Sequence, residues 1–292
     1  MKLYLWLNLD APLEVEDPVG YRCSSRMQAQ IASLAQRLLR RPQRGPWHLL
    51  GGQEVELDFL VPGAVEKGIV PGSRALPWCP TPSALSALRA RGLEVGSVPS
   101  LDVLRSVLSR RFHAELGATL EGECFVTTPD ALREALAHDE GRTWILKRAY
   151  SFAGRGRKLV QPRAIDEGTQ RWIAASFASG GLQVEPKVEV ECEFSLHGYV
   201  LEGGGQRLFD ARVLEVDDRG AWLATRDALG HELAAHEREA LVREGSRCAL
   251  ALASAGYHGP FGIDAFRWRD ATGASQFRAR SEVNPRFTMG FF

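Results

Sequence analysis

The sequence predicts an α/β protein of two to three lobes, and three observations support this. The chain has 292 residues, which is long enough for one large domain or several smaller lobes. Its composition of 45% hydrophobic, 25% charged and 9% aromatic residues is typical of a globular protein rather than a disordered or disulfide-framed one. Strand-like and helix-like segments alternate in the N-terminal third, and strands dominate from Thr143 onward.

The N-terminal third opens with alternating strands and helices. Apolar strand patterns occur at residues 2–9, 54–61 and 74–78, and helical periodicity occurs at residues 25–40 and 83–91. Such alternation is typical of a sheet whose strands are connected by helices. We therefore expect an α/β sheet in this region.

The remaining elements follow from the same periodicity. Thr128 is a suitable N-cap and Pro129 suits the first helical position, so a second lobe is expected to begin near this point. The expected elements are, in chain order, a helix at 101–116, a strand at 124–126, a helix at 130–137, strands at 144–149 and 158–161, a helix at 164–179, strands at 182–188, 192–200, 207–215 and 221–224, a helix at 232–255, and strands at 261–268 and 276–284.

The charge balance and the apolar runs limit the classes of partner. Lys and Arg together number 36, as do Asp and Glu, so no basic excess predicts nucleic acid or an anionic membrane as a partner. Asn8 and Asp10 interrupt the apolar residues 3–7, which predicts a strand rather than a signal peptide. Residues 248–256 form the longest other apolar run, far below the ~18 residues of a membrane span. We expect a cytoplasmic protein.

The strongest local pattern lies near the C-terminal end. Residues 270–274 suit a hairpin loop between strands 261–268 and 276–284. If the hairpin is centred on Gly273, Asp264 lies directly opposite Glu282. Polar residues alternate with apolar ones along the second strand and therefore share one face, namely Gln276, Arg278, Arg280, Glu282, Asn284 and Arg286.

Two carboxylates that face each other on one side of a sheet repel unless a positive charge lies between them. Asp264, Glu282 and Asn284 offer only oxygen ligands, and Mg²⁺ binds through one or two carboxylates together with phosphates and water. The alternative is a solvated sheet face on which the arginines of the same strand neutralise the acids. The spacing leaves both interpretations open.

A second pattern combines a lysine-bearing strand with a loop of small residues. The strand at 144–149 carries Lys147, and the loop after it contains Ser151, Ala153, Gly154 and Gly156. Backbone N–H groups of such a loop can approach phosphate oxygens, and a nearby lysine adds a point charge. An ordinary exposed basic hairpin has a similar composition, so this pattern is weak alone.

Taken together and in this order, these segments resemble the ATP-grasp superfamily. The resemblance rests on residues 144–157, on Val184 to Val188 followed by Glu193, on residues 259–266, and on the E-x-N-x-R pattern that begins at Glu282. It extends from about Leu101 to Phe292. It implies a small N-terminal α/β domain at 1–100 and two α/β lobes that grip ATP, at 101–188 and 189–292.

The resemblance implies roles on the nucleotide side. Lys147 is similar to the strand lysine that contacts the nucleotide, and residues 151–156 are similar to the mobile loop over the phosphates. Glu193 matches a ribose-binding carboxylate. The hinge whose backbone binds adenine is matched by Glu185, Pro186, Lys187 and Val188.

It also implies roles on the metal side. Asp264, Glu282 and Asn284 match the Mg²⁺ ligands, with Mn²⁺ as the alternative ion, and Arg286 matches the arginine that faces the phosphate or the reacting carboxylate. The family usually has an earlier nucleotide-binding lysine. Arg110 stands in the matching stretch here and keeps the charge but not the geometry of that lysine.

Enzymes that look like this use ATP to convert a carboxylate into an acyl phosphate, which an amine then attacks. The resemblance therefore implies an ADP-forming carboxylate–amine ligase that acts on small-molecule or peptide substrates. Two alternatives stay open: a nucleotide-binding regulatory module without ligase turnover, and a small-molecule kinase on the same scaffold. Relatives of this kind often form homodimers, although no motif marks an interface in this sequence.

Overall fold

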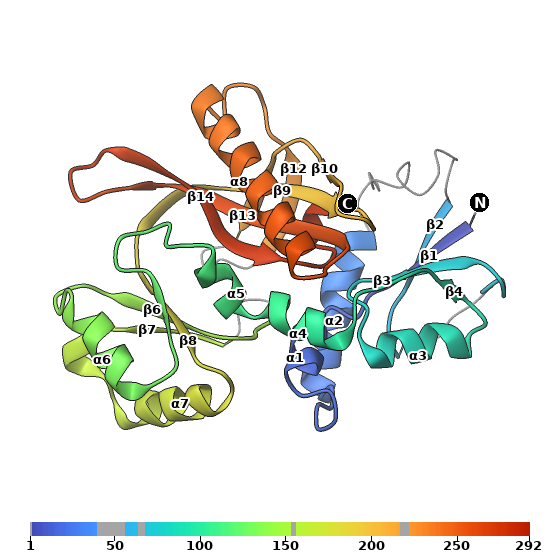
Figure 1. Cartoon of the computed structure of the whole chain (residues 1–292), viewed down its shortest axis with the longest axis horizontal. Helices are drawn as coiled ribbons and strands as arrows, with labels where there is room; N and C mark the ends of the chain where they lie inside the picture. Colours follow the sequence, from blue (N-terminus) through green and yellow to red (C-terminus); the bar gives the residue numbers. More distant parts are fainter. Residues whose placement is uncertain (1, 40–55, 64–67, 153–155, 217–221) are drawn as a thin grey trace.

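The computed structural model describes residues 2–39, 56–63, 68–152, 156–216 and 222–292, and these form three sheets (Figure 1). The N-terminal sheet has the spatial order β2-β1-β3-β4, and its paired strands are parallel. Parallel neighbours need crossover connections, which explains the predicted alternation of strands and helices. Its elements are β1 (Lys2–Trp6), α1 (Ala11–Glu16), α2 (Ser25–Leu39), β2 (Glu56–Leu60), β3 (Arg74–Pro77), α3 (Pro82–Ala90) and β4 (Glu94–Val95).

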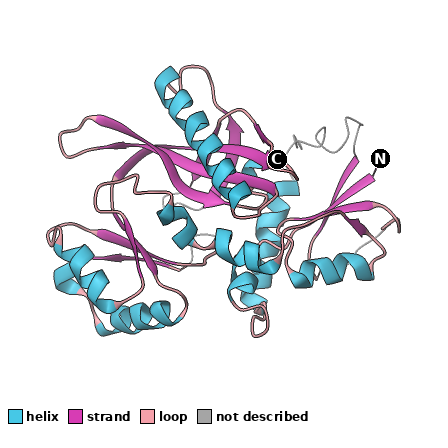
Figure 2. Cartoon of the chain, viewed as in Figure 1, coloured by secondary structure: helices cyan, strands magenta, loops and turns pink. Residues whose placement is uncertain are grey.

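The central sheet is antiparallel, with the order β5-β8-β6-β7. Two helices cover one side of it, so that the other side faces the C-terminal sheet (Figure 2). Thr128 caps the first of these helices by accepting a hydrogen bond from the Ala131 amide, as expected. The elements are β5 (Cys124–Val126), α6 (Pro129–Ala137), β6 (Trp144–Arg148), β7 (Arg157–Val160), α7 (Glu167–Ala178) and β8 (Leu182–Pro186).

The C-terminal sheet has the order β12-β11-β9-β13-β14, and a short β10 pairs with β9. Its long β13–β14 hairpin extends on the same side of the molecule as the central sheet (Figure 1). Among the described residues, no helix combines the length and apolar character needed to cross a membrane. The elements are β9 (Glu189–Val200), β10 (Gln206–Leu208), β11 (Arg212–Val216), β12 (Trp222–Asp227), α8 (Ala235–Ser254), β13 (Gly259–Arg269) and β14 (Ser275–Asn284).

Several boundaries differ from the expected ones. The predicted helix at 101–116 is two helices, α4 (Leu101–Leu108) and α5 (Arg110–Glu115). The break occurs because Ser109 has extended backbone angles and its side chain accepts a hydrogen bond from the Arg111 amide, which starts a new helix. The predicted strand at 207–215 is split into β10 and β11. The predicted strands at 54–61 and 221–224 begin outside the described residues.

The apolar side chains form separate cores. One continuous core joins the N-terminal and C-terminal sheets, and it includes Leu5 and Trp78 on one side and Phe261 and Phe287 on the other. The central sheet has a core of its own around Trp144. The central sheet therefore meets the rest of the molecule chiefly through polar groups, which form the candidate site.

Candidate active site

Asp264 of β13 and Glu282 of β14 lie directly opposite each other in the C-terminal sheet, which confirms the predicted pairing. The strands are not paired symmetrically about Gly273, however. Near the turn Phe266 pairs with Arg278, so between this pair and the Asp264–Glu282 pair β13 contributes one residue and β14 contributes three. This irregularity in β14 is what places the two carboxylates opposite each other.

Asp264 has too little positive charge around it to offset the neighbouring carboxylates. The pKa of Asp264 is raised to about 7, because burial and the nearby charges of Glu282 and Glu193 disfavour its ionised form. Arg286 and a hydrogen bond from Asn284 Nδ2 to Asp264 Oδ2, at 3.0 Å, offset this effect only in part. A cation held between the carboxylates would remove the repulsion.

The donor set fits a hard cation such as Mg²⁺, which prefers carboxylate and amide oxygens. Ser195 of β9 lies directly opposite Asp264 on its other side, and its hydroxyl is buried without a hydrogen-bond partner among the described residues. A buried hydroxyl without a partner among the described residues therefore lies next to the Asp264–Glu282 pair. No group of three or more His, Cys, Asp or Glu side chains in the described part of the chain has a metal-binding arrangement. A cation here would also depend on Asn284, water or phosphate oxygens.

Three basic side chains gather around Glu282. Partial burial alone would raise the pKa of Glu282, but Arg110, Lys147 and Arg286 hold it below its usual value. Arg110, the first residue of α5, donates to Glu282 Oε1 at 2.5 Å and to the Ser151 hydroxyl at 2.6 Å. The predicted substitute for the missing family lysine thus lies beside both the predicted metal site and the start of the predicted phosphate loop.

Arg286 lies two residues beyond Asn284, the last residue of β14. Its Nη2 donates to Asn284 Oδ1 and its Nη1 donates to the Phe287 carbonyl, both at 3.0 Å. The Asn284 side chain therefore connects Arg286 to Asp264. For the Asn284 oxygen to bind a cation, this amide must exchange its Arg286 partner.

Lys147 of β6 forms an ion pair with Glu185 of β8 through Nζ and Oε1. Glu185 is buried, and its second oxygen accepts a hydrogen bond from Arg278 Nη1 at 3.0 Å. Burial alone would raise the pKa of Glu185, but the charges of Lys147 and Arg278 hold it below its usual value. The side chain of Glu185, a predicted hinge residue, therefore binds two cations.

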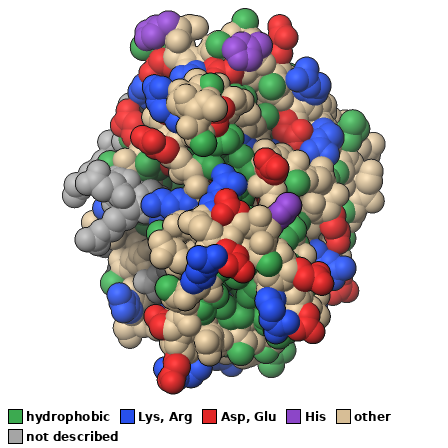
Figure 3. Space-filling model, turned by 90° about the vertical axis from the view of Figure 1, so that its left-hand side faces the viewer, with side chains coloured by type: hydrophobic (Ala, Val, Ile, Leu, Met, Phe, Trp, Pro, Cys, Tyr) green, Lys and Arg blue, Asp and Glu red, His purple; other side chains and the backbone are tan. Residues whose placement is uncertain are grey.

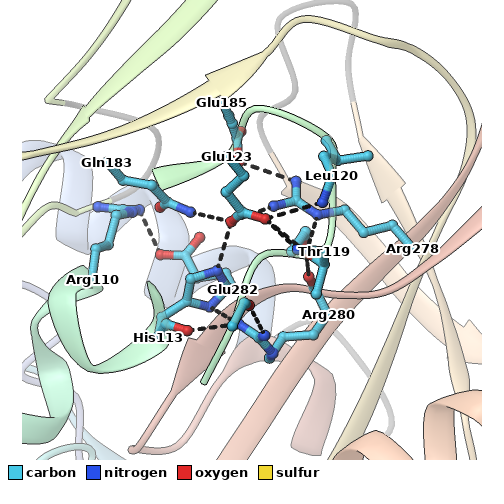
Figure 4. Close-up of polar contacts among 12 residues, drawn as sticks. Arg110, His113, Thr119, Leu120, Glu123, Gln183, Glu185, Arg278, Arg280 and Glu282 are labelled. Carbon is cyan, nitrogen blue, oxygen red and sulfur yellow. Dashed lines mark hydrogen bonds and ion pairs between the residues drawn. The ribbon is translucent and has the colours of Figure 1, made fainter. Parts of the chain in front are cut away.

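Next to the Lys147–Glu185 pair lies a buried polar network between the central sheet and the C-terminal sheet (Figure 4). Arg278 Nη2 donates to Glu123 Oε1 at 2.7 Å, and Gln183 donates to the same oxygen at 2.8 Å. Arg280 donates to Glu244 of α8 at 2.5 Å and to the His113 carbonyl at 2.7 Å. The network therefore joins strands of both facing sheets to α5 and α8.

The ionisation of the network is set by its surroundings. Burial would raise the pKa of Glu123, but hydrogen bonds from His113 and Thr119 and the charge of Arg278 keep it below its usual value. Burial lowers the pKa of His113, so its ring is neutral near pH 7. The alternative in which Arg278, Arg280 and Arg286 neutralise Asp264 and Glu282 is therefore wrong for Arg278 and Arg280, because other carboxylates bind them.

The predicted phosphate loop is described in part. Ser151 binds Arg110, and Gly156 has φ +72°, a left-handed backbone conformation that favours glycine. A Cβ atom at Gly156 would lie 3.3 Å from the Ser151 Cβ, so the two ends of the loop are in close contact. The predicted loop residues Ala153 and Gly154 lie outside the described residues.

The predicted hinge connects the two sheets that face each other. Pro186 ends β8, and Lys187 and Val188 lead directly into β9. The Lys187 amide donates to the Thr143 carbonyl at 2.9 Å, and its side chain is exposed. Burial raises the pKa of Glu193, although Arg157 and Lys147 lower it in part. Glu193 therefore lies near the positive charges of Arg157 and Lys147.

Charged side chains of both signs are interspersed on the face that carries the central sheet (Figure 3). No extended patch of a single sign is visible on this face of the described residues, which agrees with equal totals of 36 basic and 36 acidic residues. The charged side chains of the candidate site lie inside the molecule, around Glu282 and Glu185.

Two sheets that face each other across a row of paired charges, with a third parallel sheet beside them, define an α/β protein with a polar site between its lobes. This arrangement is the ATP-grasp fold, which the sequence resemblance predicted. No protein-family model and no curated protein matches the sequence. The fold assignment therefore comes from solved structures.

Three of these structures illustrate the similarity. The β,γ-ATP complex of biotin carboxylase from Campylobacter jejuni has a TM-score of 0.57 and 12% identity, over 98% of this chain and 65% of that one. D-alanyl-alanine synthetase A from Vibrio cholerae has a TM-score of 0.51 and 14% identity, over 97% and 88%. The ATP complex of carboxyaminoimidazole ribonucleotide synthase from Aspergillus clavatus has 0.50 and 13%, over 99% and 71%. At these identities the similarity establishes the fold.

The sequence reasoning missed two acidic residues and one arginine that complete the site. Glu123, Glu244 and the buried role of Arg278 were not predicted. A signal for Arg278 existed, because it alternates with Phe277 and Ala279 in the middle of a strand. Glu123 and Glu244 have no such signal, since each lies far in sequence from the arginine of β14 that it binds.

Proposed function

We propose that this protein is an ADP-forming ligase that uses Mg²⁺ and ATP to activate a carboxylate for attack by an amine. The observation that carries this proposal is the pairing of Asp264 with Glu282 beneath Arg110, Lys147 and Arg286. Two opposed carboxylates suit a divalent cation, and three basic groups around them suit the phosphates of a nucleotide. The ATP-grasp fold is consistent with this use.

Each residue has a part in the proposed reaction. The γ-phosphoryl group is transferred to a carboxylate oxygen, which gives an acyl phosphate and ADP, and the amine then displaces phosphate and loses a proton to form an amide. Lys147 and Arg110 orient the phosphates, and Arg286 stabilises negative charge on the transferred group. Bound Mg²⁺ at Asp264 and Glu282 supplies further charge neutralisation.

The adenosine part is assigned to the hinge and to Glu193. We propose that the backbone of residues 185–188 contacts adenine and that Glu193 accepts hydrogen bonds from the ribose hydroxyls. Glu193 is supported by its place on β9 beside the Lys147 charge. Ser151 and Gly156 close the loop over the phosphates, and Arg110 holds the Ser151 end of that loop.

A second candidate is a nucleotide-binding module without ligase turnover. One observation favours it: Arg110 already neutralises Glu282, and Arg286 already binds Asn284, so two of the three proposed metal ligands have an arginine as partner. In this candidate the arginines replace the cation permanently. Nucleotide then binds without any transfer of its γ-phosphoryl group.

A hydroxamate assay separates the candidates. Purified protein is incubated with Mg-ATP, hydroxylamine and a panel of amino acids, short peptides and small carboxylic acids, while ADP and phosphate are followed. We expect hydroxamate with one class of acid, with equal amounts of ADP and phosphate. Nucleotide binding with neither hydroxamate nor ADP would instead support the binding module, and ADP without phosphate would indicate a kinase.

Matched variants make the assay specific to the carboxylate pair. Glu282→Gln is expected to abolish turnover while the circular dichroism spectrum stays unchanged. Glu191→Gln is the control, because Glu191 lies in β9 of the same sheet but binds Arg269 and Ser275 near the hairpin turn. Equal turnover in Glu282→Gln and the wild type would contradict the proposed metal site.

A further inference from the structure

Two arginines are buried in β14, the strand that carries Glu282. The side chains of Arg278 and Arg280 have no exposed surface, although neither lies in the apolar core. Replacing buried ion pairs with apolar residues is often neutral or stabilising, so stability alone does not explain buried arginines in a strand. A role in the neighbouring site is the alternative explanation.

The partners of the two arginines separate their roles. Arg278 divides its donors among Glu185, Glu123 and Thr119, at 3.0, 2.7 and 2.8 Å. Arg280 contacts none of these carboxylates, since its carboxylate partner is Glu244. Only Arg278 therefore reaches a residue that also binds Lys147.

Glu185 is shared between two cations from opposite sheets. Its Oε1 contacts Lys147 of β6, and its Oε2 contacts Arg278 of β14. A lysine ammonium has three donors, and one is spent on Glu185. The other two N–H donors of Lys147 can bind an anion only if the ammonium does not contact both carboxylate oxygens of Glu185.

We propose that Arg278 is a positioning residue that acts through Glu185 to hold Lys147 ready for the phosphates of the nucleotide. By occupying Oε2, Arg278 confines the Lys147 contact to Oε1 and takes up part of the Glu185 charge. The Lys147 ammonium then keeps both a fixed position and positive charge for an anionic ligand. The inference rests on the proposed nucleotide site, and it adds a residue that does not itself touch the ligand.

The charges around Glu185 support these separate roles of Arg278 and Lys147. The cations that face it are Lys147 from β6 and Arg278 from β14, and Glu123 lies behind Arg278. Without Arg278, Glu185 would have Lys147 as its single cationic partner and Glu123 would lose its ion pair. The attraction between Glu185 and Lys147 would then compete directly with binding of phosphate to Lys147.

The test measures binding of the non-hydrolysable analogue AMP-PNP with Mg²⁺ by isothermal titration calorimetry. We expect Arg278→Met to weaken binding about tenfold, which corresponds to about 1.4 kcal/mol. Arg267→Met is the control, because Arg267 lies on the neighbouring strand β13 and forms an ion pair with Glu237, but it contacts neither Glu185 nor Glu123. Its dissociation constant should stay within about twofold of wild type, as for an independent site.

A double-variant cycle distinguishes positioning from general loss of structure. In a Glu185→Gln background the neutral amide has no charge to share, so adding Arg278→Met should change the dissociation constant less than about twofold. If Arg278→Met does not fold, Arg278→Met with Glu123→Gln keeps the charges balanced while still removing the second partner of Glu185. This double variant should show the same loss of affinity.

The outcomes separate this inference from the proposed function. Equal weakening in Arg278→Met and Arg267→Met, or wild-type affinity in Arg278→Met, would overturn the positioning role while leaving the nucleotide site in place. A full tenfold effect that persists in the Glu185→Gln background would also overturn it. Failure of the wild-type protein to bind AMP-PNP would overturn the nucleotide site and this inference together.

Discussion

Arg110 and Glu282 lie 172 residues apart in the chain and form an ion pair with 2.5 Å between Nη2 and Oε1. The pair connects the first turn of α5 to the strand that carries two proposed metal ligands. The same guanidinium donates to Ser151 and to the Arg148 carbonyl. One side chain therefore links the end of β6, the start of the loop after it and the proposed metal site.

Removing Arg110 should make the protein more responsive to Mg²⁺. In Arg110→Met, Glu282 loses its closest cation and faces Asp264 without it, so Mg²⁺ no longer competes with a guanidinium. We expect millimolar Mg²⁺ to raise the Tm by about 2 °C more in Arg110→Met than in wild type, or about 1 kcal/mol for a chain of this size. Differential scanning fluorimetry measures the shift. An identical Mg²⁺ response in wild type, Arg110→Met and Arg110→Met with Glu282→Gln would contradict the site.

Breaking the buried network should cost far more stability than breaking a surface pair. Glu123→Gln removes the charge that balances Arg278 where both side chains are almost fully buried, and we expect a loss of about 3 kcal/mol in the free energy of unfolding. Glu115→Gln is the control, because Glu115 and Arg111 form an exposed pair, for which about 0.5 kcal/mol or less is expected. Urea unfolding measures both losses. Equal losses would show that the buried network contributes no more to the free energy of unfolding than an exposed ion pair does.

His197 should make stability depend on pH. Burial, with a smaller effect of Arg212, lowers the pKa of His197 to about 3, while an unfolded histidine has a pKa of about 6.5. Between these values the unfolded state binds one more proton, so this contribution is complete above about pH 6.5 and falls by about 1.4 kcal/mol per pH unit below it. Urea unfolding from pH 7 to pH 5 should show a shallower slope in His197→Asn. Equal slopes would contradict the buried neutral ring.

The close contact at Gly156 should matter for nucleotide binding. Gly156→Ala places a Cβ 3.3 Å from the Ser151 Cβ in a left-handed backbone, so it should displace Ser151 from Arg110. We expect a stability loss of about 1 kcal/mol together with weaker binding of Mg-AMP-PNP. Gly273→Ala has the same kind of backbone strain, at φ +82°, with no described atom within 4 Å of the added group. It should lose similar stability and keep wild-type affinity, as calorimetry can verify.

The sequence predicted the site through local patterns and missed what depends on contact between sheets. A hairpin centred on Gly273 correctly predicts Glu282 opposite Asp264, although the two strands are paired with an irregularity that no periodicity reveals. Alternation in β14 put Arg278 on a polar face, but it could not show that the central sheet covers that face. Ser109 was read as a helical residue because its role as a cap depends on its backbone angles.

The arrangement of the cores has a mechanical consequence. Separating the N-terminal and C-terminal sheets would expose aromatic contacts such as Trp78 on Phe287 and Phe292, and burying such surface is worth about 25 cal/mol per Å². The central sheet meets this two-sheet frame mainly through ion pairs, whose partners water can replace. The central sheet carries Lys147, while the two-sheet frame carries Asp264 and Glu282, so any movement of the central sheet against the frame would change the distance from Lys147 to the carboxylate pair.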